Sequence, residues 1–159
     1  MLAGERRNFF DGFSIVTCRR SLKNMRIHHV GIAVESLEKA VPIFELLLGA
    51  PTEPAEAVED QKVRVAVFHV GESRIELLEA SAPESPISRF IGKRGPGMHH
   101  LTLTVTNLEQ TLSDLDQRGV KLIDRHPRKG AGNESIAFIH PSSTAGVLIE
   151  LVEERQAGK

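Results

Sequence analysis

The sequence predicts an α+β fold of two tandem βαβββ modules that form a curved, eight-stranded cup with the helices outside. An internal repeat is the first observation that favours it: HHVGIAV at 28–34 recurs as HHLTLTV at 99–105, and IELLE at 75–79 recurs as IELVE at 149–153. The second observation is that both halves show strand and helix patterns in the same order. Neither module is large enough to bury a core alone, so we expect the two to pack side by side.

The first module is expected to span 25–80. Residues 26–34 alternate or run apolar and contain β-branched side chains, which is typical of a strand. Residues 36–48 carry apolar side chains at helical spacing and end at Gly49, which predicts a helix that Pro42 kinks. Three further strands are expected at 50–58, 62–70 and 73–80.

The second module repeats this order over 97–153. A strand is expected at 98–105, followed by a helix at 107–118 that begins with Asn107 and ends before Gly119. The connection at 81–97 is rich in Pro, Ser and Gly and is predicted to be a loop. The last three strands are expected at 121–126, 134–140 and 146–153.

The 159 residues fit a single domain at 25–153, preceded by an extension at 1–24 and followed by a tail at 154–159. The extension is basic, and we interpret it as a poorly ordered segment or as the result of a misassigned start, with Met25 the true one. A formal net charge of -1 gives no electrostatic reason to expect a nucleic-acid partner. A single cysteine and the absence of any apolar stretch of roughly 18 residues predict a cytoplasmic protein with no membrane partner.

A His and a Glu recur at matched points of the two modules, at His29 and Glu76 and again at His100 and Glu150. Strand side chains alternate between two faces, and each of these four has the parity opposite to that of its apolar neighbours. All four are therefore expected on the concave face. A buried carboxylate is costly unless it is paired or bound to a metal, so the four residues predict one divalent ion as cofactor. The ligand set does not choose among cobalt, zinc, nickel and manganese.

Any one of these four residues, taken alone, is more often structural or exposed to solvent, and their recurrence is what favours a metal site. His28 and His99 share the apolar parity. We interpret them as structural, or as the ligands if the strand register is shifted by one. The remaining histidines have no counterpart in the other module and are expected on the surface or in loops: His69, His126 and His140.

The segments that carry a family resemblance lie at 27–34, 75–78, 97–100, 138–141 and 146–151. Over 25–153 the chain resembles the vicinal-oxygen-chelate superfamily, which includes glyoxalases, bleomycin-resistance proteins and dioxygenases. Within that superfamily it is most similar to the methylmalonyl-CoA epimerases. The His140–Pro141 pair before the last strand favours the epimerases over glyoxalase I.

The resemblance implies the interconversion of (R)- and (S)-methylmalonyl-CoA in propionyl-CoA metabolism, with an acyl-CoA as substrate and a homodimer as the assembly. The proton that the reaction removes is bound to the carbon between the thioester carbonyl and the carboxylate. Its removal leaves an enolate whose charge a divalent ion stabilises. Inversion needs a base on one face and an acid on the other, and Glu76 and Glu150 are the expected catalytic pair. Some relatives carry a further glutamate where this chain has Val65, which cannot move protons. The two-base assignment therefore rests on Glu76 and Glu150, or on a residue not identified from the sequence.

Three further residues are expected to contact the substrate. Thr102 shares the parity of His100 and faces the cup. Arg128 and Lys129 open a loop at 128–133 that is expected to close over the cup and meet coenzyme A phosphates, although a merely solvated loop would carry the same charges.

Three other functions fit parts of the pattern. Glyoxalase I would use the same four ligands to isomerise a glutathione hemithioacetal. A ring-cleaving dioxygenase needs two His and one Glu around iron, and the second Glu argues against it. A non-enzymatic small-molecule binding protein on the same fold needs no metal, and the complete ligand set argues against that function.

Overall fold

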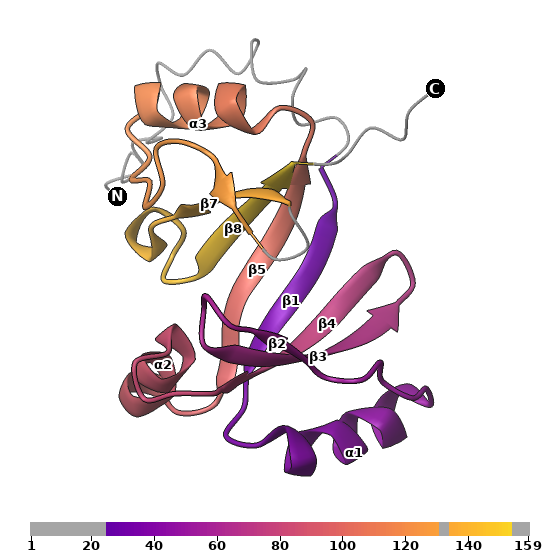
Figure 1. Cartoon of the computed structure of the whole chain (residues 1–159). Helices are drawn as coiled ribbons and strands as arrows, with labels where there is room; N and C mark the ends of the chain where they lie inside the picture. Colours follow the sequence, from indigo (N-terminus) through magenta and orange to yellow (C-terminus); the bar gives the residue numbers. More distant parts are fainter. Residues whose placement is uncertain (1–24, 131–133, 154–159) are drawn as a thin grey trace, which may run out of the picture.

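A computed structural model describes residues 25–130 and 134–153 of the chain (Figure 1). Expectations about the extension at 1–24, residues 131–133 of the loop and the tail at 154–159 lie outside the described residues. One eight-stranded sheet runs through the domain in the order β2-β3-β4-β1-β5-β8-β7-β6. This sheet, with helices packed against it, confirms the α+β prediction of two side-by-side modules.

The first module follows the predicted order. Its helix begins after Ser36, whose side chain accepts a hydrogen bond from the Lys39 backbone N–H, and ends at Gly49 in the left-handed conformation. The strand predicted at 50–58 is much shorter than expected. The elements are β1 (Ile27–Ala33), α1 (Leu37–Leu48), β2 (Glu56–Val58), β3 (Val63–Val70) and β4 (Ser73–Ala80).

The second module contains one corrected strand. Residues 121–126 form only an isolated bridge between Leu122 and Ile139, because the Asp124 carboxylate accepts the Phe138 backbone N–H that a neighbouring strand would otherwise take. A two-residue strand after this segment forms the sheet edge instead. The elements are β5 (Gly97–Val105), α3 (Leu108–Gln117), β6 (Arg128–Lys129), β7 (Ser135–Ile139), a 3₁₀ turn (Pro141–Ser143) and β8 (Leu148–Glu153).

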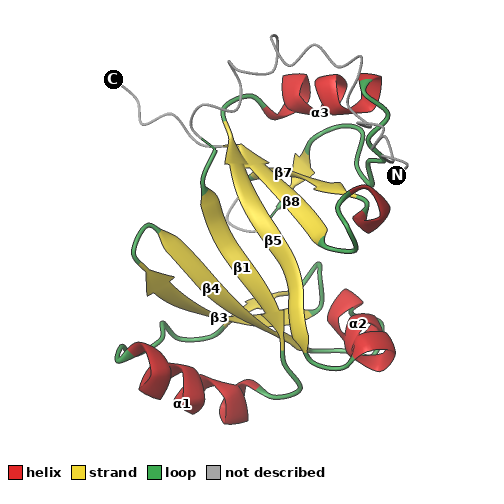
Figure 2. Cartoon of the chain, turned by 180° about the vertical axis from the view of Figure 1, so that it is seen from behind, coloured by secondary structure: helices red, strands yellow, loops and turns green. Residues whose placement is uncertain are grey.

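The connection between the modules contains a third helix, α2 (Pro86–Arg94), where the sequence predicted a loop. Buried Ser85 accepts a hydrogen bond from the Ile87 backbone N–H, and Pro86 occupies the first turn, where its missing N–H costs nothing. A Ser-Pro pair is therefore a helix-start signal that the Pro, Ser and Gly content obscured. Figure 2 shows α2 beside the beginning of β5, apart from α1 and α3.

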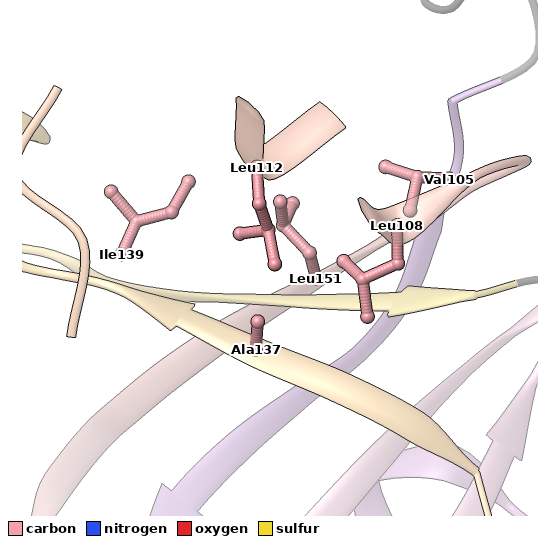
Figure 3. Close-up of a cluster of buried hydrophobic side chains, with 6 residues drawn as sticks. All are labelled: Val105, Leu108, Leu112, Ala137, Ile139 and Leu151. Carbon is pink, nitrogen blue, oxygen red and sulfur yellow. The ribbon is translucent and has the colours of Figure 1, made fainter. Parts of the chain in front are cut away.

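The apolar positions of the central strands pack against α1 and α3, as their parity predicted. Leu77 of β4 meets Leu37 and Phe68 under α1. Figure 3 shows the equivalent cluster under α3, which comprises Val105, Leu108, Leu112, Ala137, Ile139 and Leu151. Side chains of the opposite parity lie on the other face of the sheet, where Ala33 and Leu78 pack with Ile87 of α2. No helix within 25–130 and 134–153 is long and apolar enough to cross a bilayer.

Candidate metal centre

The four predicted ligands come from four adjacent strands, β4, β1, β5 and β8. Across the two modules, β1 and β5 pair antiparallel, with Gly31 opposite His100. Within each module the outer partner is parallel, so Glu76 of β4 lies opposite Gly31 and Glu150 of β8 lies opposite Thr102. The register therefore brings residues far apart in the sequence to the middle of one sheet, beside His29. Figure 1 shows β1 and β5 side by side at this junction.

Three of the four predicted ligands converge in a buried cluster. The Nε2 atoms of His29 and His100 lie 3.0 Å apart. Glu150 Oε2 lies 3.3 Å from the first of these nitrogens and 3.9 Å from the second. The three residues are 7%, 8% and 7% exposed, in the same order. Donors bound to one divalent ion at about 2.0–2.2 Å stand roughly 3 Å from each other, so the cluster has the chemistry and size of a metal site.

Glu76 lies beside this cluster. Its Oε1 is 3.5 Å from His29 Nδ1 and 3.9 Å from Arg74 Nε, so it faces the other nitrogen of the same imidazole. Among the described residues, the group whose donor atoms all lie within 4.8 Å of one another contains His29, His100 and Glu150 without Glu76. Ligation by Glu76 stays a prediction, and it requires the Glu76 side chain to turn toward the Nε2 atom of His29.

Thr102 is completely buried between the two modules. Its hydroxyl donates a 2.6 Å hydrogen bond to Glu150 Oε2 and lies 2.8 Å from His29 Nε2. The sequence placed Thr102 on the cup face as a substrate contact. Its partners in the structure are site residues instead, so it holds the Glu150 carboxylate in place, and a contact with substrate stays a prediction.

Burial and the contacts between neighbouring side chains together shift the pKa values of the site residues. Burial lowers the pKa of His100 to about 4, although Glu150 opposes the shift. Burial also raises the pKa of Glu76, which the neighbouring His29 partly offsets. Burial alone would raise the pKa of Glu150 too, but the contacts with His29, His100 and Thr102 lower it overall. The two carboxyl groups thus shift in opposite directions, which is the pattern expected of an acid and a base in one site.

The structure adds contacts that the parity argument missed. His28 Nδ1 lies 2.9 Å from His29 Nδ1, and His99 Nδ1 lies 2.8 Å from His100 Nδ1. Both pairs sit at register shifts between β1 and β5, where a simple alternation of faces breaks down. Arg74 was also missed, although it shares the parity of Glu76. Its Nη2 lies 2.9 Å from His28 Nε2.

The other predicted residues lie farther out. Arg128 Nε donates to Asp124, and its guanidinium stands over the Phe138 ring at 5.1 Å. That ring in turn meets His100 edge-on at 6.2 Å, so Arg128 borders the site. Both Arg128 and Lys129 are exposed. Val65 packs in an apolar cluster beside α2. The histidines predicted on the surface or in loops are all exposed there: His69, His126 and His140.

Comparison with known proteins identifies the family. Residues 28–138 match the Glyoxalase/Bleomycin resistance protein/Dioxygenase superfamily. The chain is 43% identical to the uncharacterized protein YqjC of Bacillus subtilis over 130 residues, covering 82% of this chain and 93% of the relative. It is 34% identical to the mitochondrial methylmalonyl-CoA epimerase of Homo sapiens over 127 residues, covering 79% of this chain and 72% of the relative.

A solved structure is similar along nearly its whole length. It is a methylmalonyl-CoA epimerase in complex with methylmalonyl-CoA and NH4+, with 30% identity and a TM-score of 0.76. The alignment covers 85% of this chain and 98% of that one. The chain therefore belongs to the glyoxalase, bleomycin resistance protein and dioxygenase superfamily, and within it is homologous to the methylmalonyl-CoA epimerases.

Proposed function

We propose that this protein is a metal-dependent methylmalonyl-CoA epimerase. The observation that carries the proposal is a buried cluster of His29, His100 and Glu150 with Glu76 beside it, in a chain homologous to the epimerases. The structural neighbour that holds methylmalonyl-CoA supports an acyl-CoA as the substrate. We also infer a homodimer, which rests on the family resemblance.

The residues that would hold the ion are His29 and His100 through Nε2 and Glu150 through Oε2. Burial favours a neutral His100 and the neighbouring contacts favour an ionised Glu150, which are the forms that ligate a metal. Glu76 is the proposed fourth ligand, and at least one of the two glutamates would leave the metal when substrate binds. Cobalt, zinc, nickel and manganese all suit this mixed nitrogen and oxygen set. A bound divalent ion would supply Lewis-acid stabilisation of the negative charge that develops on the thioester carbonyl.

The two glutamates are the proposed proton carriers. They lie on opposite sides of the His29 imidazole, Glu76 near Nδ1 and Glu150 near Nε2. In one direction ionised Glu150 takes the proton at the carbon between the carboxylate and the thioester, and protonated Glu76 returns one to the other face. The raised pKa of Glu76 favours its acid form, and the lowered pKa of Glu150 favours its base form. In the reverse direction the two exchange roles.

Arg128 is the proposed anion contact at the rim. Its position over Phe138 and its bond to Asp124 fix the guanidinium near the site. A fixed guanidinium suits a phosphate or carboxylate group of an acyl-CoA better than a freely moving one, because less side-chain entropy is lost on binding. Lys129 is proposed to act in the same way, and its exposure leaves the ammonium accessible.

The test is activity of chelator-treated protein before and after addition of Co²⁺, with two substrates offered separately. We expect restored epimerisation of methylmalonyl-CoA and no isomerisation of the glutathione hemithioacetal of methylglyoxal. Turnover of the hemithioacetal alone would contradict the proposal and indicate glyoxalase I. Failure to turn over either substrate, with no Co²⁺ bound, would indicate a binding protein.

A further inference from the structure

Each module begins with a pair of histidines, and the proposed mechanism uses only the second of each pair. The first members, His28 and His99, occupy matching irregularities in the β1–β5 pairing. Between the Ile27–Leu103 and His29–Thr102 pairs, β1 contains one extra residue, which is His28. The Gly31–His100 and Ile32–Met98 pairs leave His99 as the extra residue of β5 in the same way. Bulges of this kind re-aim a side chain beside a functional site.

The re-aimed ring reaches the ligand that follows it. His99 Nδ1 lies 2.8 Å from His100 Nδ1, while His100 Nε2 points at the donor cluster, 3.0 Å from His29 Nε2. The two nitrogens of His100 therefore have separate partners. The His99 ring is itself held edge-on by Phe90 of α2, with ring centroids 4.9 Å apart. The helix between the modules thus touches the metal centre through one imidazole.

A neutral imidazole carries one proton, and coordination through Nε2 requires that proton on Nδ1. The Nδ1–H of a ligating histidine then needs an acceptor, which is usually a carboxylate, a backbone carbonyl or water. Around His100 Nδ1 the described structure offers the imidazole nitrogen of His99 at hydrogen-bond distance. His28 makes the same contact with His29, but Arg74 donates to that ring as well, so His99 is the cleaner case.

We propose that His99 is a positioning residue of the metal centre: its Nδ1 accepts the Nδ1–H of His100 and keeps the Nε2 lone pair of His100 directed at the ion. The proposal rests on the metal site put forward above. Removing such a partner commonly weakens metal affinity by about 10–100-fold. A purely structural His99, by contrast, would matter only through its ring packing on Phe90.

Two substitutions of His99 separate a role in positioning His100 from a role in packing on Phe90. His99→Phe keeps a ring against Phe90 and removes the acceptor, whereas His99→Asn removes the ring and keeps a polar atom close to the position of Nδ1. For Co²⁺ affinity by calorimetry we expect wild type above His99→Asn, and His99→Phe weakest by about 10–100-fold. For the Tm of the metal-free proteins we expect the two variants in the opposite order. The Tm of His99→Phe should be close to that of wild type, and the Tm of His99→Asn should be lower. The visible absorption spectrum of bound Co²⁺ should change in His99→Phe.

Equal Co²⁺ affinity and an identical spectrum in wild type and His99→Phe would overturn the positioning role alone. A wild-type protein that binds no Co²⁺ would overturn the metal site and this role together. Should a variant fail to fold, nitrogen NMR of ¹⁵N-histidine wild type loaded with Zn²⁺ decides. We expect a protonated Nδ1 on His100 and an unprotonated Nδ1 on His99; a proton on His99 Nδ1 would contradict the proposal.

Discussion

The Nε2 atoms of His29 and His100 lie 3.0 Å apart in the buried centre of the sheet, although 71 positions separate the two residues in the chain. Two imidazole nitrogens at this distance either share one proton or bind one ion. Protons and metal therefore compete for the same lone pairs, and metal binding is expected to release protons. Substitution of the residues that surround the two histidines tests this competition.

Substitution of Glu150 tests the third donor. Glu150→Ala removes a buried carboxylate that contacts both imidazoles and the Thr102 hydroxyl. We expect activity below detection and a fall in metal occupancy, measured by elemental analysis after gel filtration. His140→Ala is the control, because that side chain is exposed and bonds locally to Ser142. Equal loss of metal from both variants would contradict the assignment of Glu150.

Glu76→Gln is expected to stabilise the metal-free protein at pH 7. Burial raises the pKa of Glu76 in the folded state, so its ionisation costs folding free energy above the unfolded pKa of 4.5. The amide removes that cost, and the gain in Tm should vanish as the pH falls below 4.5. Epimerase activity should fall by about 10²–10⁴-fold, because the amide moves no proton. A Tm lower than that of wild type at pH 7 would contradict a raised pKa of Glu76.

His100 contributes to the pH dependence of stability. Its folded-state pKa of about 4 lies below the ordinary value of 6.5, so the unfolded chain binds more protons between these limits. The stabilising contribution of neutral His100 is therefore complete above pH 6.5 and is lost progressively as the pH falls toward 4. Urea unfolding of metal-free protein at several pH values measures this. The loss of unfolding free energy between pH 6.5 and 4 should be smaller in His100→Gln than in wild type. In the exposed control His69→Gln it should equal that of wild type.

Gly31 gives the His100 ring its space. A Cβ at position 31 would collide with Cε1 of that ring and lie 2.6 and 2.8 Å from its two nitrogens. Gly31→Val should displace the ring and weaken Co²⁺ affinity by more than about tenfold, as expected when a metal ligand loses its orientation. Gly92→Val is the matched control, since a side chain there meets open space. Unchanged affinity in Gly31→Val would show that the ring tolerates the shift.

Much of the architecture could be predicted because the repeat fixes the order of elements and strand parity fixes the faces. His29, His100 and Glu150 reached one cluster for that reason. The parity rule fails at His28 and His99, because an extra residue in either strand resets the alternation without any sign in the local composition.

Two other departures from the sequence prediction concern α2 and residues 121–126. Helix α2 was missed because it spans only nine residues, too few for a clear apolar period, although its Ser85–Pro86 start is recognisable in retrospect. The strand predicted at 121–126 failed because the Asp124 carboxylate competes with the backbone for the Phe138 N–H. This competition depends on which segment folds beside Asp124. The sequence around residues 121–126 does not contain that information.

The most direct test of the central claim is proton NMR of methylmalonyl-CoA in D₂O, following exchange of the hydrogen on the carbon between the thioester and the carboxylate. Chelator-treated protein should exchange it no faster than buffer, and added Co²⁺ should restore rapid exchange in wild type but not in Glu150→Ala. Rapid exchange by the metal-free protein, or by Glu150→Ala, would contradict a metal-assisted proton transfer at this cluster.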